Sequence, residues 1–338
     1  MKTAEREGRQ AELLRGKRIA VVYGAVSEED ALYIRNVPRA DWSLSAILEA
    51  LTGLGLEAEH LDPTHNDFIE RIQLFDVAFL NVHGPYGEDG RIQGLLDYLS
   101  IPYTTSGVLA SSIGMDKLAS KAIFTYLGIP VPRGLPLLRP ETAEEVSAGF
   151  AFPAMLKAVD GGSSVGMAMI NEPGELAREA ETLKRRGFKR LFLEEFIHGR
   201  AVTVSAVESA EGSIVLPPLE FITESSYYDE STKLGGSQAP KVEYVVPDDL
   251  PPHVVKGLTE QTRCVYDFLA CRGAIRVDYM IDELGTTYAL EVNTNPGLQQ
   301  HSNLPVSCAL EGMAYPELIE RLVLHALKSF EPAPWTVR

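Results

Sequence analysis

The sequence predicts a mixed α/β protein built from an open parallel α/β domain, a small antiparallel lid and a C-terminal α+β domain. Strand-like runs alternate with helical patterns over roughly the first 115 residues, which is typical of an open parallel sheet. From Phe152 onward the strand-like runs come in pairs, which indicates antiparallel pairing. The chain length and these two patterns predict two or three domains.

The N-terminal part begins with a buried strand and a helix. Residues 18–24 (RIAVVYG) form a continuous apolar run that ends in glycine, as strands buried in parallel sheets do. Apolar residues then recur at helical spacing between Leu44 and Leu54. Residues 76–84 (DVAFLNVHG) repeat the strand pattern, and residues 115–130 predict a helix that ends in a glycine before a proline.

Four further runs predict the strands of the lid. Residues 154–159 are expected to pair with 165–170, and residues 190–196 with 202–207. The last third contains, in chain order, a loop-rich insertion at 223–249, a helix at 254–271, strands at 274–281 and 287–292, and a closing helix from 316 to about 330.

Composition and charge exclude several classes of protein. The 338 residues are 45% hydrophobic and 23% charged, which excludes a disordered or fibrous chain. The net charge of −16 argues against nucleic acid or an anionic membrane as the main partner. No apolar run approaches the roughly 18 residues of a membrane span. Cys264, Cys271 and Cys308 lack zinc-site spacing and are expected to be reduced packing residues, so we expect a cytoplasmic protein.

Two glycine-rich segments offer candidate ligand sites. Residues 157–170 (KAVDGGSSVGMAMI) place two glycines and two serines between strands, so the hairpin tip could offer N–H groups and hydroxyls to phosphate, or could be an ordinary hairpin. Neither the P-loop pattern nor the dinucleotide fingerprint occurs, which excludes an NAD-dependent dehydrogenase. His83 opens the loop 83–90 (HGPYGEDG) at a strand end, where open α/β sheets bind ligands, although a simple turn histidine is an equal alternative.

A cluster of oxygen-bearing side chains predicts a magnesium site. Asp278, Glu291 and Asn293 lie near the ends of two adjacent predicted strands, and Glu291 and Asn293 share a face because they are two residues apart. Three hard oxygen ligands are what Mg²⁺ requires when it holds phosphates. Acidic residues before a turn can also be merely solvated strand ends. Arg276, on the same face as Asp278, adds a cation.

In this order, the motifs resemble those of the D-alanine–D-alanine ligase branch of the ATP-grasp superfamily. The resemblance extends from residue 18 to the last helix, and its most specific motifs are HGPYGEDG (83–90), LDYLSIPYTTSGVLASSIGMDK (96–117), KAVDGGSSVGM (157–167), LEEFIHG (193–199), IRVDYMID (275–282) and LEVNTNPG (290–297). It implies an ATP-grasp fold with domains at residues 17–115, 116–205 and 206–332, which grips ATP between the central and C-terminal domains. It also implies two Mg²⁺ ions, replaceable by Mn²⁺, and a homodimer.

The resemblance also implies roles for individual residues. The ATP-binding positions are Lys117 and Lys157 at the phosphates, Gly162, Ser163 and Ser164 in the loop that closes over them, and Glu194, Glu195, Phe196 and Ile197 at adenine. The magnesium ligands are Asp278, Glu291 and Asn293. The catalytic positions are Arg276 and the Gly297 amide at the oxyanion, with Ser163, Glu29 and Lys233. The amino-acid-binding positions are Glu29, His83, Ser163 and Leu234 for the first substrate and Ser302 and Asn303 for the second.

Three departures from the family pattern concern the substrates. The acid that holds the ribose falls on Ala201, and the tyrosine of the mobile loop falls on Leu234. The first glycine loop is longer, at residues 24–43, and offers both Glu28 and Glu29 as the substrate acid. We therefore expect an ATP- and Mg²⁺-dependent ligase that joins amino acids through an acyl phosphate, specialised for substrates other than D-alanine. The alternatives are a housekeeping cell-wall D-alanine–D-alanine ligase and a nucleotide-binding module without turnover.

Overall fold

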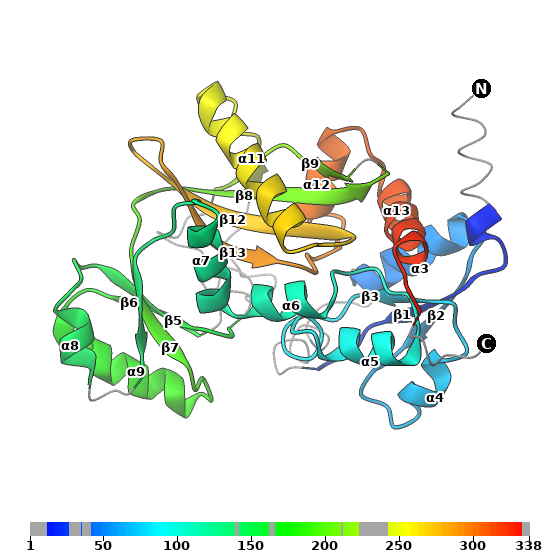
Figure 1. The fold of residues 1–338 in the computed structure, drawn as a ribbon, viewed down its shortest axis with the longest axis horizontal. Helices are drawn as coiled ribbons and strands as arrows, with labels where there is room; N and C mark the ends of the chain where they lie inside the picture. Colours follow the sequence, from blue (N-terminus) through cyan, green and yellow to red (C-terminus); the bar gives the residue numbers. More distant parts are fainter. Residues whose placement is uncertain are drawn as a thin grey trace.

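Three β-sheets organise the chain in the computed structural model (Figure 1). The structure describes residues 12–26, 35, 42–138, 142–161, 166–210, 212–222 and 243–332. A three-stranded sheet lies in the N-terminal part, a four-stranded sheet in the centre and a six-stranded sheet in the C-terminal part. The mixed α/β class predicted from the sequence is confirmed.

The first sheet is parallel, as the alternating pattern predicted. Its strands are β2 (Glu57–Leu61), β1 (Arg18–Val22) and β3 (Val77–Leu80), in that spatial order. In β1 every residue after Arg18 is buried, because helices cover both faces of the sheet. The helices near this sheet are α3 (Ser43–Gly53), α4 (Phe68–Ile72) and α5 (Arg91–Leu99).

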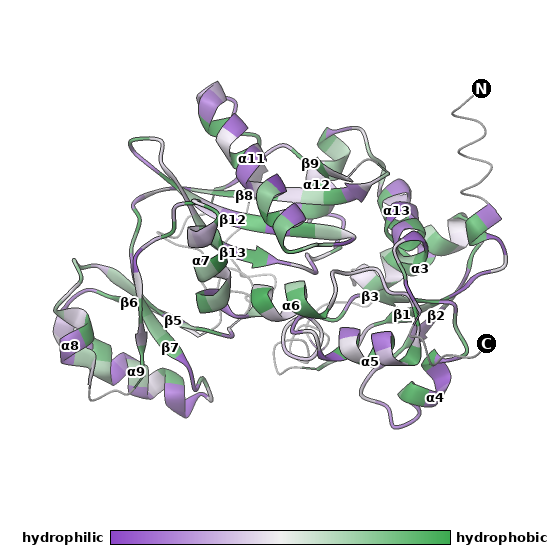
Figure 2. Ribbon diagram, in the orientation of Figure 1, coloured by the Kyte–Doolittle hydropathy of each residue, from purple (hydrophilic) through white to green (hydrophobic). Residues whose placement is uncertain are grey.

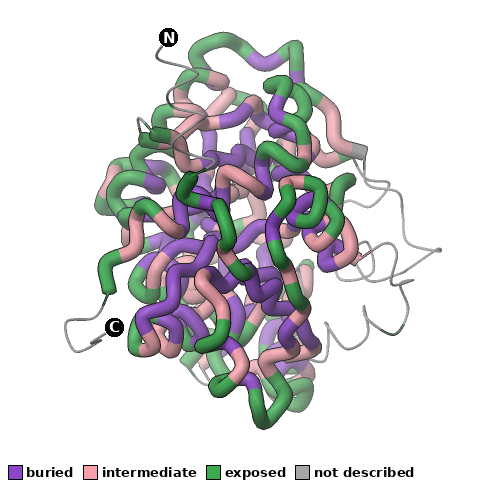
Figure 3. Tube along the Cα trace, turned by 90° about the vertical axis from the view of Figure 1, so that its right-hand side faces the viewer, coloured by how far each residue is buried: buried purple, intermediate pink, exposed green. Residues whose placement is uncertain are grey.

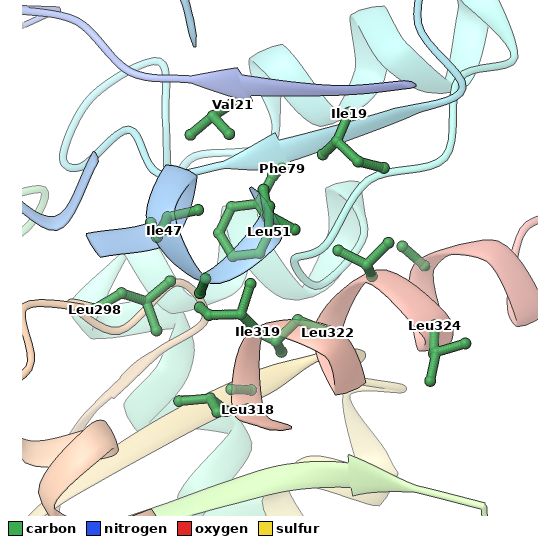
Figure 4. Packing of buried hydrophobic residues seen from close by; sticks show 14 of the residues in the cluster. Ile19, Val21, Ile47, Leu51, Phe79, Leu298, Leu318, Ile319, Leu322 and Leu324 are labelled. Carbon is green, nitrogen blue, oxygen red and sulfur yellow. The ribbon is translucent and has the colours of Figure 1, made fainter. Parts of the chain in front are cut away.

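The last helix of the chain packs on this first sheet. Helix α13 (Tyr315–Lys328) lies against α3, and Leu318 and Ile319 share a core with Ile47, Leu51 and Phe79 (Figure 4). The opposite face of the sheet has a separate core, to which α4 and α5 contribute. The two ends of the described chain therefore meet in one hydrophobic core.

The central sheet is antiparallel, with α8 (Ala143–Ser147) and α9 (Leu176–Arg185) packed against it. Its strands, in spatial order, are β4 (Gly134–Leu137), β7 (Leu191–Glu195), β5 (Ala154–Ala158) and β6 (Met167–Ile170). The expected pairing of 154–159 with 165–170 is confirmed by β5 and β6. The expected pairing of 190–196 with 202–207 is wrong, because β7 pairs with β4 and β5.

The strand after β7 belongs to the third sheet. Strand β8 (Gly199–Ser209) begins at a glycine where any Cβ would lie 1.9 Å from the carbonyl oxygen of Ile281. This close approach lets β8 join the C-terminal sheet immediately after a short connection. The domain boundary expected between residues 205 and 206 falls inside β8, all of which pairs within this sheet, and the three-domain division stays a prediction.

The third sheet forms the largest layer of the molecule. Its spatial order is β11 (Glu243–Val245), β10 (Leu219–Ile222), β8, β12 (Ala274–Asp282) and β13 (Thr287–Asn293), with β9 (Gly212–Val215) paired to β8. Helix α11 (Pro252–Phe268) and helix α7 (Lys117–Tyr126) share its hydrophobic core. Two shorter helices, α6 (Val108–Met115) and α12 (Asn303–Leu310), complete the set around it. The two strands and the helices predicted for this region are confirmed.

Burial follows hydropathy along the chain. Apolar residues concentrate in the strands and on the inner faces of the helices, and exposed residues lie around the periphery (Figures 2 and 3). Cys271 and Cys308 are buried as predicted, whereas Cys264 is exposed on α11, so the packing role predicted for it is wrong. All three cysteines are free. Among the described helices, none combines the length and apolar character needed to cross a bilayer.

A substitution at Gly273 would test the contact between the first and third parts of the fold. Its φ is +65°, and an added Cβ would lie 2.2 Å from the carbonyl oxygen of Thr104. We expect Gly273→Ala to lower the free energy of unfolding by about 1–3 kcal/mol in urea denaturation. The control is Gly257→Ala in α11, where the added Cβ meets open space and should raise stability by about 0.5–1 kcal/mol. Equal midpoints for the two variants would show that the close approach at Gly273 does not constrain the fold.

Candidate active site

A cavity of about 600 Å³ lies between the central sheet and the C-terminal sheet. Strands β5, β6 and β7 contribute one wall, and β8, β10, β12 and β13 contribute the other. Helix α7 and the loop that begins at His83 also reach it. The cavity is large enough for a nucleotide-sized ligand.

The C-terminal wall carries charges at paired positions of β12 and β13. Arg276 lies opposite Asn293, and Asp278 lies opposite Glu291. Both guanidinium nitrogens Nε and Nη2 of Arg276 donate to the Asp278 carboxylate at 2.8 Å. The Thr203 hydroxyl donates to the same carboxylate at 2.6 Å. The prediction that these side chains share a face is confirmed, although Asp278 lies in the middle of β12 rather than near its end.

A β-bulge aligns this wall. The pairing shifts between Asp278, opposite Glu291, and Tyr279, opposite Ala289, so Leu290 has no partner residue. If the pairing of Tyr279 with Ala289 continued without a bulge, Leu290 would lie opposite Asp278. The Glu291 side chain would then point to the buried face of the sheet. The extra residue therefore turns Glu291 toward the cavity, which is a common use of bulges near functional sites.

Lys117 joins this wall to the central sheet. Its Nζ lies 2.8 Å from Glu291 Oε2 and donates to the Gly161 carbonyl at 2.5 Å. Burial works against the charged form of Glu291, but Lys117, and then Arg276 and Lys157, outweigh burial and hold its pKa at about 2. Glu291 is therefore an anion at any physiological pH.

A second charged group lies deeper, on the wall of the central sheet. The Glu194 side chain is 1% exposed, and its two oxygens each lie 2.5 Å from an ammonium group, Oε1 from Lys121 and Oε2 from Lys157. Burial opposes ionisation of Glu194, but the charges of Lys157 and Lys121 keep its pKa below the ordinary value. Burial lowers the pKa of Lys121 in turn.

Apolar side chains line the part of the cavity near these lysines. They include Met155, Met167, Phe196, Met280 and Leu290. The rings of Phe196 and His198 meet edge to face at 4.8 Å between centroids. Apolar side chains beside a charged group suit a purine attached to phosphates.

Loops supply further polar groups to the cavity. His83 Nδ1 lies 3.4 Å from a Glu88 oxygen, and its Nε2 is buried without a partner among the described residues. Ser302 donates to Gln299 at 2.9 Å, and Gly297 lies beside both. Asn303 opens α12 and also lines the cavity.

Several predicted positions cannot be compared with the structure. Glu28, Glu29, Gly162, Ser163, Ser164, Lys233 and Leu234 lie outside the described residues. Ala201 does line the cavity. Its neighbour Arg200 is held by Glu220 and Asp249, with nitrogen–oxygen distances of 2.5–2.9 Å.

Sequence reasoning missed three residues of the site. Lys121 lies one helical turn after Lys117, a spacing that puts both lysines on one face of α7 and could have indicated it. Glu88 lies within the glycine loop 83–90, and the presence of an acidic residue in the same loop as His83 was the available signal. No pattern in the sequence could have indicated Thr203, because its role depends on the pairing of β8 with β12.

Comparison with known proteins identifies the family. Two family profiles match, D-ala D-ala ligase C-terminus over residues 123–324 and D-ala D-ala ligase N-terminus over residues 55–106. The D-alanine–D-alanine ligase of Syntrophotalea carbinolica is 34% identical, covering 94% of this chain and 98% of its own, and that of Geobacter sulfurreducens is 35% identical, covering 93% and 95%. The solved D-alanine–D-alanine ligase of Bacillus anthracis complexed with ATP has a TM-score of 0.76 and 28% identity, covering 93% of this chain and 98% of that one.

The chain belongs to the D-alanine–D-alanine ligase family. It is therefore an ATP-dependent ligase that forms C–N bonds between small molecules, and its fold is the ATP-grasp fold expected from the motifs. The alternative of a nucleotide-binding module without turnover is set aside.

The buried Glu194 group yields a stability prediction. Glu194→Ala removes the carboxylate and leaves two buried ammonium groups facing each other, so the free energy of unfolding in urea should fall by about 3–5 kcal/mol at neutral pH. Because the pKa of Glu194 is lowered in the folded state, its contribution is complete above the ordinary carboxyl pKa and is lost as the pH falls. The difference between wild type and variant should therefore shrink in acid.

The neighbouring Glu195 provides the control for this measurement. It is exposed on the same strand, so Glu195→Ala should change the unfolding free energy by no more than about 0.5 kcal/mol. A Glu194→Ala variant as stable as Glu195→Ala would show that the buried ion group does not support the fold.

Proposed function

We propose that this protein joins two D-alanine molecules, using ATP to activate the first carboxylate as an acyl phosphate. The observation that carries the proposal is the convergence of Lys117, Lys157 and Arg276 with two carboxylates in one cavity. A carboxylate and ATP repel each other, so a site that brings them together needs several fixed cations. The names of the curated relatives support D-alanine as the substrate.

The proposed site divides the reaction among its walls. Lys117 and Lys157 bind the phosphates of ATP, and the apolar side chains beside Phe196 receive adenine. Arg276 and the amide of Gly297 face the place where the second amino group attacks, and they stabilise the developing oxyanion. The amine itself is the nucleophile, so no side chain needs to form a covalent intermediate.

Asp278, Glu291 and Asn293 are the proposed magnesium ligands. They supply hard oxygen donors at paired positions of β12 and β13, which is the donor chemistry that Mg²⁺ prefers. Across the described residues, no three His, Cys, Asp or Glu side chains form a metal-binding group, and this set has two carboxylates and one amide. When bound, Mg²⁺ neutralises phosphate charge during transfer. The homodimer expected from the family stays a prediction.

A specialised amino-acid ligase is the second candidate. Leu234 stands where the family pattern has a tyrosine, and the segment at 24–43 is longer than usual. Leucine can neither donate nor accept a hydrogen bond, so the pocket for the first amino acid loses one polar contact. This favours a bulkier or more apolar substrate than D-alanine.

Substitution of Glu291 tests the metal site. Glu291→Gln removes one negative charge that a divalent ion would require, so kcat should fall about a hundredfold or more while the protein stays folded. The measurement is phosphate release from ATP at saturating Mg²⁺ and amino acid. The matched control is Glu311→Gln. Glu311 is an exposed residue just after α12, so this substitution should leave kcat unaltered. Near-normal ligation by Glu291→Gln would remove the metal assignment.

A panel of amino acids decides between the two candidate functions. Phosphate release is measured with D- and L-amino acids, singly and in pairs, and the dipeptide is identified by mass. Highest activity with D-alanine alone supports the main proposal, and higher activity with another pair supports the specialised ligase. In that second case Leu234→Tyr should shift preference toward D-alanine by about ten- to a hundredfold, the worth of one buried hydrogen bond.

A further inference from the structure

The two-lysine arrangement around Glu194 gives Lys121 a function that the roles above leave unassigned. We propose that Lys121 is a positioning residue of the nucleotide site, which compensates the buried Glu194 carboxylate so that Lys157 can transfer its ammonium group to a phosphate. This inference rests on the proposed binding of ATP phosphates by Lys157. It assigns Lys121 no contact with the reacting atoms.

The geometry supports a division of labour between the two lysines. Each ammonium lies on a different oxygen of Glu194, at 2.5 Å, so either can leave without breaking the other contact. Lys157 extends from β5 and its side chain is 12% exposed, whereas Lys121 extends from α7 and is 8% exposed. Both lysines line the cavity, and the proposal gives the phosphate contact to Lys157, the slightly more exposed of the two.

The burial of Glu194 explains why a second lysine is required. A carboxylate that is 1% exposed cannot be left unpaired without a large desolvation penalty. With a single lysine partner, any phosphate contact for which Lys157 leaves Glu194 would break that pair. With two, the carboxylate remains compensated throughout.

The location of Lys121 makes it rigid enough for this task. Asp116 caps α7 by accepting from the Ala119 amide at 2.9 Å, and Phe124 of the same helix is fully buried in the core of the third sheet. Lys121 therefore has its backbone fixed one turn inside an anchored helix. Because the Lys121 side chain is also 8% exposed and paired with Glu194, we expect its ammonium to remain there when Lys157 moves.

The experiment compares the affinities for ATP and for adenosine, measured by calorimetry. Adenosine lacks phosphates, so the ratio of its dissociation constant to that of ATP reports on phosphate recognition alone. In Lys121→Met, Glu194 has only Lys157 as a partner, so Lys157 stays with the carboxylate and does not contact phosphate. The ratio should then fall about ten- to a hundredfold, which corresponds to the loss of one charge-assisted hydrogen bond. Lys121→Arg should restore it. The exposed control Lys256→Met in α11 should leave the ratio unchanged.

A double variant separates positioning by Lys121 from direct contact between Lys121 and phosphate. In Lys121→Met with Glu194→Gln, no buried carboxylate holds Lys157, so the ratio should return to within about threefold of wild type. A ratio that stays low would mean that Lys121 itself contacts phosphate, and would overturn the proposal. Equal losses for ATP and adenosine in Lys121→Met would also overturn it, because they would show a merely structural role. If Lys121→Met does not fold, the double variant still carries the test, since it has no unpaired buried carboxylate.

Failure of this inference can be told apart from failure of the proposed function. Lys157→Met removes the proposed phosphate contact itself, so it should lower the ratio whether or not Lys121 has a positioning role. If Lys157→Met leaves the ratio unchanged, the phosphate site itself is wrongly placed. If Lys157→Met lowers it and Lys121→Met does not, the phosphate site stands and the role of Lys121 is rejected.

Discussion

The register between β12 and β13 is the constraint on which the site depends. Side chains of a strand alternate between two faces, and in β12 the odd-numbered residues fill the core while Arg276 and Asp278 face the cavity. Strand β13 matches them with Glu291 only because the bulge at Leu290 shifts the pairing by one residue. Without that shift a carboxylate would enter the core, where burying an unpaired charge is prohibitive.

The cations of the site are held in place by acids rather than by the phosphates they are proposed to bind. Arg276 pairs with Asp278, Lys117 with Glu291, and two lysines share Glu194. Such pairs keep the charged groups oriented at low exposure, so little reorganisation is needed when an anion arrives. On the proposed assignment, a phosphate or a metal ion would compete for one partner of each pair, and this competition would couple the binding of the two.

The sequence predicted the elements of the site better than their partners. Period-two alternation and glycine turns are local signals, and they located β12, β13 and the face shared by Glu291 and Asn293. The predicted pairing of β7 with β8 is wrong for a non-local reason. Two strands that follow each other in the chain can join different sheets when a glycine at their junction allows the backbone to turn sharply. Lys121 was missed for a similar reason: its partner Glu194 comes from a strand that is distant in sequence.

Contacts between the first and third parts of the fold explain how the His83 loop reaches the charged wall. The side-chain amide of Asn295, just after β13, donates to the Val82 carbonyl at 2.8 Å and is buried. Ser106 accepts from the Arg272 amide at 3.2 Å, and α13 shares a core with the first sheet. Because Val82 directly precedes His83, the Asn295 contact fixes the histidine relative to Asn293 and Gly297. The parallel sheet thus serves the site by holding one loop at a set distance from the charges.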